Sequence, residues 1–570
     1  MMVQDRPDWA ARIVPALGGL TALYLVGAPL LMLLYAAFRG PADFLPFEPG
    51  AEWTLDNVRG VFSEPLLYTR VIPDTLQFVA GTVTLTTLFA FGLAWLVERT
   101  DMPGRNVWFS LVLFPLLVPI PVLGIAWIML LGPNAGWANM AIRSLTGWSG
   151  AGPLNIFSMP GLILCQSLAS TPFAFIQFTA ALRTMSPALE EAGYMAGASP
   201  LTTFRRITFP VLLPGLLAPI ILVMLVTFEQ FELPLIVGLP ARINVFAYRI
   251  FSELTPSSGL PSYGGAAAVA LPFMALGLCA LWLYNRAIRN AGHFVTITGK
   301  GYVQRRLRLG RWRWPSLILF GTYVAFAAGL PAFTLIWTSL FGFLAPGKAS
   351  LADLTFKHYA DFLFNPAFWT AIRNSLVVAG LSALIVSLLG GLIAWTVSRS
   401  KLPWRKALDA LSFMSLGIPA VIAGLAVMVL YLSMPIGIYG TVWILVLAYS
   451  YRLATATRIA RASLLQIHPE LEEAAQMAGA RWLTTQVRIL LPLLRPALVS
   501  GFALVFIVGL REFTIPLVLY SPDNLVLSVL VWQLFQNGQP APSAALGAMM
   551  IALVFPMIFA LRTTIVPNSD

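Results

Sequence analysis

Two copies of one polar motif, each with a pair of adjacent glutamates, are the strongest chemical signal in this sequence. Residues 187–210 and 469–492 align without a gap at an offset of 282, and 15 of the 24 positions are identical. The paired glutamates are Glu190, Glu191, Glu472 and Glu473. Unrelated membrane sequences share apolar residues but rarely Glu-Glu, Gly, Thr-Thr, Arg and Pro in register. The motif therefore indicates an internal repeat.

The residue order within the motif predicts a small helical hairpin. Pro187 or Pro469 opens a short helix whose first turn holds the glutamates, where carboxylates favour the positive helix end. Gly197 or Gly479 then ends the helix and permits a sharp turn. A second amphipathic stretch runs to the closing proline, which opens the next membrane helix. We expect a compact helix–turn–helix exposed to the cytosol in each half.

Elsewhere in the chain the sequence predicts neither a catalytic site nor a bound cofactor. Residues 342–349, GFLAPGKA, nearly match a nucleotide phosphate loop, but Ala349 has no hydroxyl for magnesium and no strand precedes the segment. The histidines and cysteines are scattered, at positions 293, 358 and 468 and at positions 165 and 279. We therefore expect no catalytic residue, no metal site, no cofactor and no disulfide framework.

Four charged residues lie near the ends of two otherwise apolar segments: Glu229, Glu232, Arg511 and Glu512. Glu229 and Glu232 are expected about one helical turn apart on one face. The offset of 282 aligns Arg511 with Glu229, and charges at membrane depth usually pair or line a wet path. We predict that Glu229 or Glu232 pairs with Arg511 in an external gate. The alternative is that each side chain reaches the headgroups or a nearby loop.

The elements that must position these residues are membrane helices. The chain has 570 residues, of which 58% are hydrophobic and 11% charged, far fewer charges than a soluble surface needs. Apolar runs of about 20 residues suit transmembrane helices and not the alternating strands of a barrel. We predict an all-α membrane protein of about twelve spans. These lie near 13–38, 73–97, 108–131, 159–182, 211–238, 266–288, 314–341, 371–397, 409–433, 440–457, 493–520 and 543–563.

The repeat divides the spans into two parallel six-helix halves. Residues 1–288 form the first half with its polar loop at 183–210, and residues 314–570 form the second with its loop at 458–492. A basic linker, 289–313, joins them. Positive charge clusters in this linker, in residues 399–406 and at Arg452, Arg458 and Arg461, whereas loops such as 39–74 are mixed or acidic. Positive charge marks the cytoplasmic side, so both termini are expected inside. The net charge of +12 therefore reflects topology and is no sign of nucleic-acid binding.

With its paired Glu-Ala-Ala/Gly motifs and its six-plus-six span pattern, the chain resembles the permeases of binding-protein-dependent ABC importers, whose hallmark is the EAA loop. The resemblance covers nearly the whole chain; only Gly193 departs, where the family usually has alanine. It implies that each loop forms a coupling helix that docks on a cytoplasmic ATPase dimer. ATP and magnesium would then bind to that partner. Interface contacts are implied for Glu190, Glu191, Glu472 and Glu473, and the turn for Gly197 and Gly479.

The resemblance also implies a cellular location and a transported substrate. The location is the bacterial inner membrane, with a periplasmic substrate-binding protein as the second partner. Segments 231–238 and 512–517 make the chain look most like permeases for iron(III). Thiamine, 2-aminoethylphosphonate and polyamine permeases are the open alternatives. A secondary transporter of two parallel halves would share the hydropathy but would lack paired EAA loops.

Overall fold

Long apolar helices dominate the computed structural model, which describes residues 8–40, 45–184, 188–256, 259–291, 307–342 and 349–565. Helices are the expected solution, because in lipid every backbone N–H and C=O must find a partner within its own segment. The small sheet pairs Arg39–Gly40 (β1) with Glu52–Trp53 (β2) in antiparallel register. Most of linker 289–313, Pro187 and most of the phosphate-loop-like stretch lie outside the described residues.

The helices of the two halves follow one another in similar order. The first half has α1 (Ala10–Ala22), α2 (Ala28–Ala37), α3 (Asp56–Ser63), α4 (Ile72–Arg99), α5 (Arg105–Val112), α6 (Ile120–Leu131), α7 (Trp137–Thr146), α8 (Met159–Thr184), α9 (Ala188–Met195), α10 (Pro200–Thr203), α11 (Phe209–Phe228), α12 (Phe246–Leu254) and α13 (Tyr263–Ala291). The second half has α14 (Arg313–Val324), α15 (Leu330–Phe341), α16 (Lys357–Leu363), α17 (Pro366–Arg399), α18 (Arg405–Met414), α19 (Ala420–Leu432), α20 (Val442–Tyr449), α21 (Leu453–Leu464), α22 (Glu470–Met477), α23 (Trp482–Thr485), α24 (Leu491–Arg511), α25 (Thr514–Val518), α26 (Leu527–Gln536) and α27 (Pro540–Ile565).

Seven helices in the described part of the chain are long and apolar enough to cross a membrane, or up to eleven if each sharply bent pair is one span. Two bent pairs occupy matching places in the repeat: α5 with α6, bent by 95°, and α18 with α19, bent by 112°. The expected all-α membrane fold is confirmed. The predicted number of about twelve spans is higher than the seven to eleven found among the described residues, because several of the predicted segments bend or break.

The predicted tenth span, near 440–457, is wrong as a single helix. The structure has two short helices, α20 and α21, separated at Ser450–Arg452. The predicted fifth and eleventh spans are also too long, because α11 stops at Phe228 and α24 at Arg511. In each case the helix ends where the chain brings charged side chains toward the interior.

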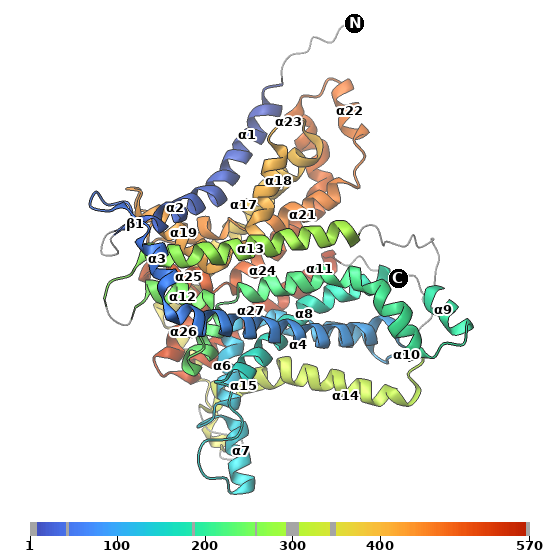
Figure 1. The fold of residues 1–570 in the computed structure, drawn as a ribbon, viewed down its shortest axis with the longest axis vertical. Coiled ribbons are helices and arrows are strands. Elements are labelled where there is room, and N and C mark those ends of the chain that lie inside the picture. The colour runs from blue at the N-terminus through green and yellow to red at the C-terminus, as the bar shows by residue number, and fades with distance from the viewer. Residues whose placement is uncertain are drawn as a thin grey trace.

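Each half builds the same three-helix core. In the first half α4, α8 and α11 pack on one another, and in the second half α17, α21 and α24 do so. Figure 1 shows α9 and α22 on the side of the molecule away from β1, α3 and α12. Each repeated hairpin therefore emerges from the same end of its core.

The two halves interlock instead of standing as separate blocks. Helices α1 and α2, from the first half, pack on α17 and α19 of the second. The hydroxyls of Tyr24 and Tyr431 lie 2.6 Å apart across this contact. In return, α15 of the second half packs on α6 of the first as well as on α27.

The end of the linker is attached to the first half. Leu307 forms backbone hydrogen bonds with Arg99 and Asp101, and the Leu309 amide donates to the Asp101 carboxylate at 2.8 Å. This hydrogen bond, with Arg313 at 3.5 Å, holds the pKa of Asp101 below its ordinary value. The start of the second half is therefore held against the loop that follows α4.

Close packing within the second core gives a stability prediction for α17. A Cβ on Gly390 would lie 2.9 Å from the Thr457 amide nitrogen and 3.0 Å from the Ala456 Cβ, whereas one on Gly380 would meet nothing nearer than 3.8 Å. Overpacking costs about 1–3 kcal/mol, and alanine in a helix gains about 0.5–1 kcal/mol over glycine. Gly390→Ala should lower the thermal unfolding midpoint in detergent, and the control Gly380→Ala should hold or raise it. Equal midpoints would contradict this packing.

Candidate functional site

The two repeated motifs fold into closely similar hairpins. Helices α9 and α22 are followed by Gly197 and Gly479, with φ of +81° and +84°. Behind each glycine the next amide donates back to the helix, Ala198 to Gly193 at 3.0 Å and Ala480 to Ala475 at 2.9 Å. The expected glycine turn is confirmed, because this left-handed conformation is strained for residues with a Cβ.

The paired glutamates of the hairpins point in different directions. Glu473 is exposed and Glu191 is half-buried, as expected for side chains that meet a partner. Glu190 and Glu472, by contrast, are each only 8% exposed and form ion pairs within the protein. Contact with another subunit stays a prediction for all four glutamates, and here Glu190 and Glu472 face the interior of the protein. Adjacent helical residues point about 100° apart, so one of each pair can face the core.

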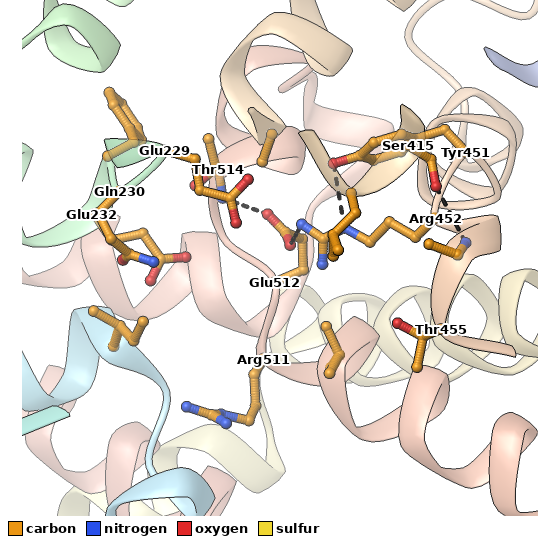
Figure 2. A pocket seen from close by; sticks show the side chains of 16 residues that line it. Glu229, Gln230, Glu232, Ser415, Tyr451, Arg452, Thr455, Arg511, Glu512 and Thr514 are labelled. Atoms are coloured by element: carbon orange, nitrogen blue, oxygen red, sulfur yellow. Dashed lines mark hydrogen bonds and ion pairs between the residues drawn. The ribbon is translucent and has the colours of Figure 1, made fainter. Parts of the chain in front are cut away.

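A cavity of about 290 Å³ lies where the central helices of the two halves end. Its charged lining residues are Glu229, Glu232, Arg452, Arg511 and Glu512. They come from the segment after α11, from the break between α20 and α21, and from the end of α24 (Figure 2). All four residues expected at a gate thus line one cavity, together with an arginine that was not predicted there.

The local geometry of the two glutamates after α11 differs from the prediction. Glu229 is the C-terminal cap of α11, and the Gln230 amide donates to the Thr227 carbonyl at 3.1 Å, which closes the helix. Glu229 and Glu232 therefore lie on either side of a turn and not on one helix face. Both face the same cavity because the chain folds back after Phe228.

The ion pair in the cavity joins Arg452 to Glu512. Their side chains are 2.5 Å apart, and Glu512 also accepts hydrogen bonds from the amides of Thr514 and Ile515 at the start of α25. Arg511 donates to the Val118 carbonyl at 2.8 Å. Among the described residues no ion pair joins Arg511 to Glu229 or Glu232, so the predicted gate pair is not formed in this structure.

Arg452 was assigned to the cytoplasmic side because Arg458 and Arg461 follow it closely. The structure instead places it at the break between α20 and α21, where the Ala454 amide freed by the break donates to the Ser415 hydroxyl at 3.1 Å. One signal was present in the sequence. Arg452 falls inside an otherwise apolar run, and such a residue usually faces a bundle interior or a wet cavity.

Some of the polar atoms in the cavity lining have no hydrogen-bond partner within the described ranges of the chain. One Glu232 oxygen is buried without a hydrogen-bond partner among the described residues, as is the Nε of Arg511. In the part of the chain that the structure describes, no three His, Cys, Asp or Glu side chains are arranged to hold a metal ion together. The lining therefore offers both signs of charge and some unsatisfied polar atoms.

A family model decides what kind of protein carries these features. The model for "Binding-protein-dependent transport system inner membrane component" matches residues 73–291 and 386–563. The chain belongs to this family. The two matches cover both hairpins and most of both cores, with α17 included from residue 386 on, so the chain is an ABC transporter permease with two fused family units. A multi-pass membrane protein follows from the same assignment.

Individual relatives extend the comparison along the whole chain. The permease is 25% identical over 548 residues to the ferric transport system permease protein FbpB of Actinobacillus pleuropneumoniae, covering 94% of this chain and 77% of the relative. It is 23% identical to the Fe(3+)-transport system permease protein FbpB 2 of Haemophilus influenzae, covering 95% and 97%. The sulfate transport system permease protein CysT of Salmonella typhimurium is 28% identical over 260 residues, covering 41% of this chain and 92% of that protein.

The ion pair in the cavity of the permease gives a prediction that a double-mutant cycle can check. Arg452→Gln and Glu512→Gln should each lower the thermal unfolding midpoint, because the first leaves the buried Glu512 carboxylate without its partner and the second leaves the half-buried Arg452 unpaired. The double variant should lose less than the sum, with an interaction energy of about 1.5–3 kcal/mol for a charged hydrogen bond.

The exposed pair Asp56 and Arg59 supplies the control for this cycle. Its Asn and Gln variants should show a coupling below about 0.5 kcal/mol, since solvent screens such a pair. Strict additivity for Arg452 and Glu512 would contradict the ion pair seen in the cavity.

Proposed function

We propose that this permease forms the transmembrane path of an ATP-driven importer for ferric iron. The full-length similarity to two ferric permeases, over both halves and the linker region, carries the proposal. The cavity is consistent with it, since three carboxylates line a space between the two cores. Carboxylate oxygens suit a hard cation, and the absence of a three-ligand cluster among the described residues suits passage rather than storage.

The hairpins α9 and α22 are the proposed docking elements for a cytoplasmic ATPase dimer, which would bind ATP and magnesium in place of this chain. Each presents an exposed helix from the same end of its core, and Figure 1 shows α9 and α22 away from β1 and α3. With these hairpins inside the cell, the start of α1 and the end of α27 are also proposed to be cytoplasmic, in agreement with the distribution of positive charge.

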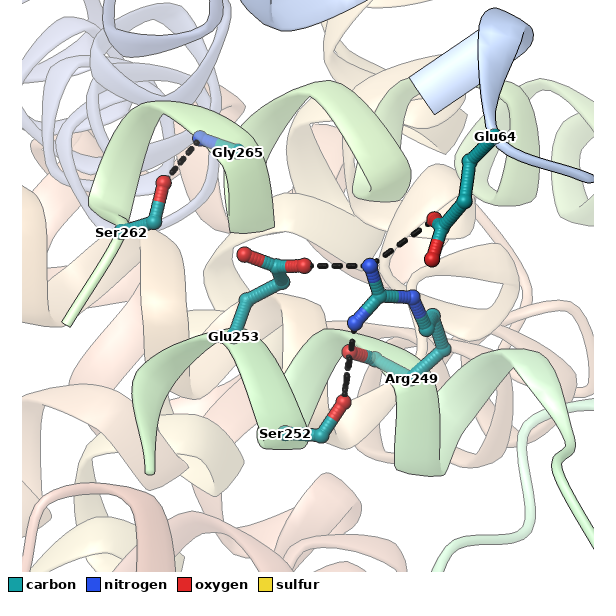
Figure 3. A network of polar contacts seen from close by, with 6 residues as sticks. All are labelled: Glu64, Arg249, Ser252, Glu253, Ser262 and Gly265. Atoms are coloured by element: carbon teal, nitrogen blue, oxygen red, sulfur yellow. Dashed lines mark hydrogen bonds and ion pairs between the residues drawn. The ribbon is translucent and has the colours of Figure 1, made fainter. Parts of the chain in front are cut away.

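The opposite face is the proposed docking side for the periplasmic binding protein. There Arg249 on α12 lies between two carboxylates, 2.9 Å from Glu64 and 2.5 Å from Glu253 (Figure 3). The Arg249 guanidinium also contacts the Ser252 hydroxyl at 3.2 Å. This network joins α12 to the segment after α3 and gives a partner a defined surface.

The cargo is tested by uptake into proteoliposomes that contain the permease with its ATPase subunit and binding protein. We expect radiolabelled ferric iron to accumulate only with ATP. Excess thiamine, 2-aminoethylphosphonate or polyamine should not compete. Competition by one of these would reassign the cargo, as the sulfate relative shows that the family serves several. Uptake that needs no ATPase would support a secondary transporter and contradict the proposal.

Docking of the ATPase is tested at the hairpin turns. Gly197→Val and Gly479→Val put a β-branched side chain at positive φ, a strain of about 1–3 kcal/mol, and should reduce copurification of the ATPase subunit and iron uptake. Gly437→Val is the matched control, because Gly437 also has positive φ, +61°, with open space around it, in the loop between α19 and α20. If all three variants behave alike, the turns have no special role in docking.

A further inference from the structure

Each hairpin is attached to its core by an arginine at the end of a long membrane helix. Arg399 ends α17 and Arg99 ends α4, and they face Glu472 and Glu190, the buried members of the glutamate pairs. We propose that Arg99 and Arg399 are positioning residues that make each hairpin move as one body with its transmembrane core. We call each of these arginines, with its glutamate and the carbonyls that it bonds, a joint. This inference rests on the proposed function, because a hairpin motion would reach the translocation path through the joints.

In the second half the joint involves three helices. Arg399 lies 3.3 Å from Glu472 and donates to the carbonyls of Leu464 at 3.1 Å and Ile467 at 2.5 Å. These carbonyls belong to the end of α21 and the segment that leads to α22. The Trp395 indole adds a hydrogen bond to Glu472 at 3.0 Å. One guanidinium thus connects the end of α17, the end of α21 and the first turn of α22.

The first half repeats the arrangement with different supporting residues. Arg99 lies 3.6 Å from Glu190 and donates to the Leu182 carbonyl, near the end of α8, at 2.8 Å. Here the Thr208 hydroxyl, from the segment that leads to α11, donates to Glu190 at 2.8 Å. The Arg99 and Glu190 side chains are 4% and 10% exposed, so this pair is shielded from solvent.

The arginine and the glutamate of each joint are far apart in the sequence and at different spacings in the two halves, so the fold and not the spacing brings them together. Glu190 follows Arg99 by 91 residues, whereas Glu472 follows Arg399 by 73. The two halves differ in the loops between, yet the same ion pair forms at the same place. A buried charge without a partner is costly, so changing either member alone is expected to disturb the hairpin.

The joint also has a mechanical consequence. The last carbonyls of α8 and α21 have no partner within their own helices; Arg99 bonds one of them, at Leu182, and Arg399 bonds Leu464, whose carbonyl also accepts from the Ile467 amide. Without Arg399, residues 465–469 would keep only their local backbone hydrogen bonds and would bend more easily between α21 and α22. A displacement of α22 would then bend residues 465–469 and would not move α17 or α21.

The test compares Glu472→Gln with Asp361→Asn in the complete transporter. Each substitution removes one negative charge, but Asp361 is exposed on α16, outside both hairpins and the cavity lining. Glu472→Gln and Arg399→Gln should lower the iron imported per ATP hydrolysed by about tenfold or more, given the cost of breaking a buried pair. The ATPase subunit should stay bound. Arg399→Lys, which keeps the charge, should recover part of the loss, and Asp361→Asn should resemble the unmodified protein.

A second readout separates this inference from the proposed function. Hydrogen exchange of the α22 amides, measured on the permease in nanodiscs, should speed up about tenfold or more in Glu472→Gln and Arg399→Gln, as expected for a local opening made easier. Exchange within α17 should not change. Unchanged exchange of α22 would overturn the joint even if iron transport is established. Faster exchange in a protein that transports another cargo would leave the joint standing and change only the proposed substrate.

Discussion

The constraint behind this structure is the cost of a polar group that has no partner in an apolar environment. In lipid the backbone meets it by forming helices. Charged side chains meet it by pairing or by facing water. The helices of the permease stop or break where such groups enter. α11 ends before Glu229, α24 ends at Arg511, and α20 is separated from α21 next to Arg452. The cavity exists because these three interruptions meet between the cores.

The two copies of the repeat remain alike at the hairpins but differ at the cavity. At the hairpin end both halves keep the same geometry, with glycines of nearly equal φ and a buried glutamate that faces an arginine. At the cavity the halves have diverged. Ser170 stands in the unbroken α8 at the place, 282 residues earlier, that corresponds to Arg452. The two hairpins thus keep the symmetry of the repeat, whereas the single cavity between the halves does not.

The two fused halves pack into one unit because each contributes helices to the other. Helices α1 and α2 pack on the second half, and α15 packs on the first. The cavity takes side chains from α6 and the turn after α11 on one side, and from α19, α21, α24 and the break before α21 on the other. Neither half could form this cavity by itself. A relative motion of the cores would therefore change its lining directly.

The sequence by itself determined the membrane class, the repeat, the two hairpins and the glycines at their turns. These features follow from local rules: apolar length, residue spacing and the freedom of glycine to adopt positive φ. It also selected four of the five charged residues that line the cavity. Only the tertiary structure decided which of them pair, that Arg452 belongs among them, and that Glu190 and Glu472 face Arg99 and Arg399. The reason is physical. A charge pairs with whatever group the packing of distant helices brings within a few ångströms, and spacing along the chain does not contain that distance.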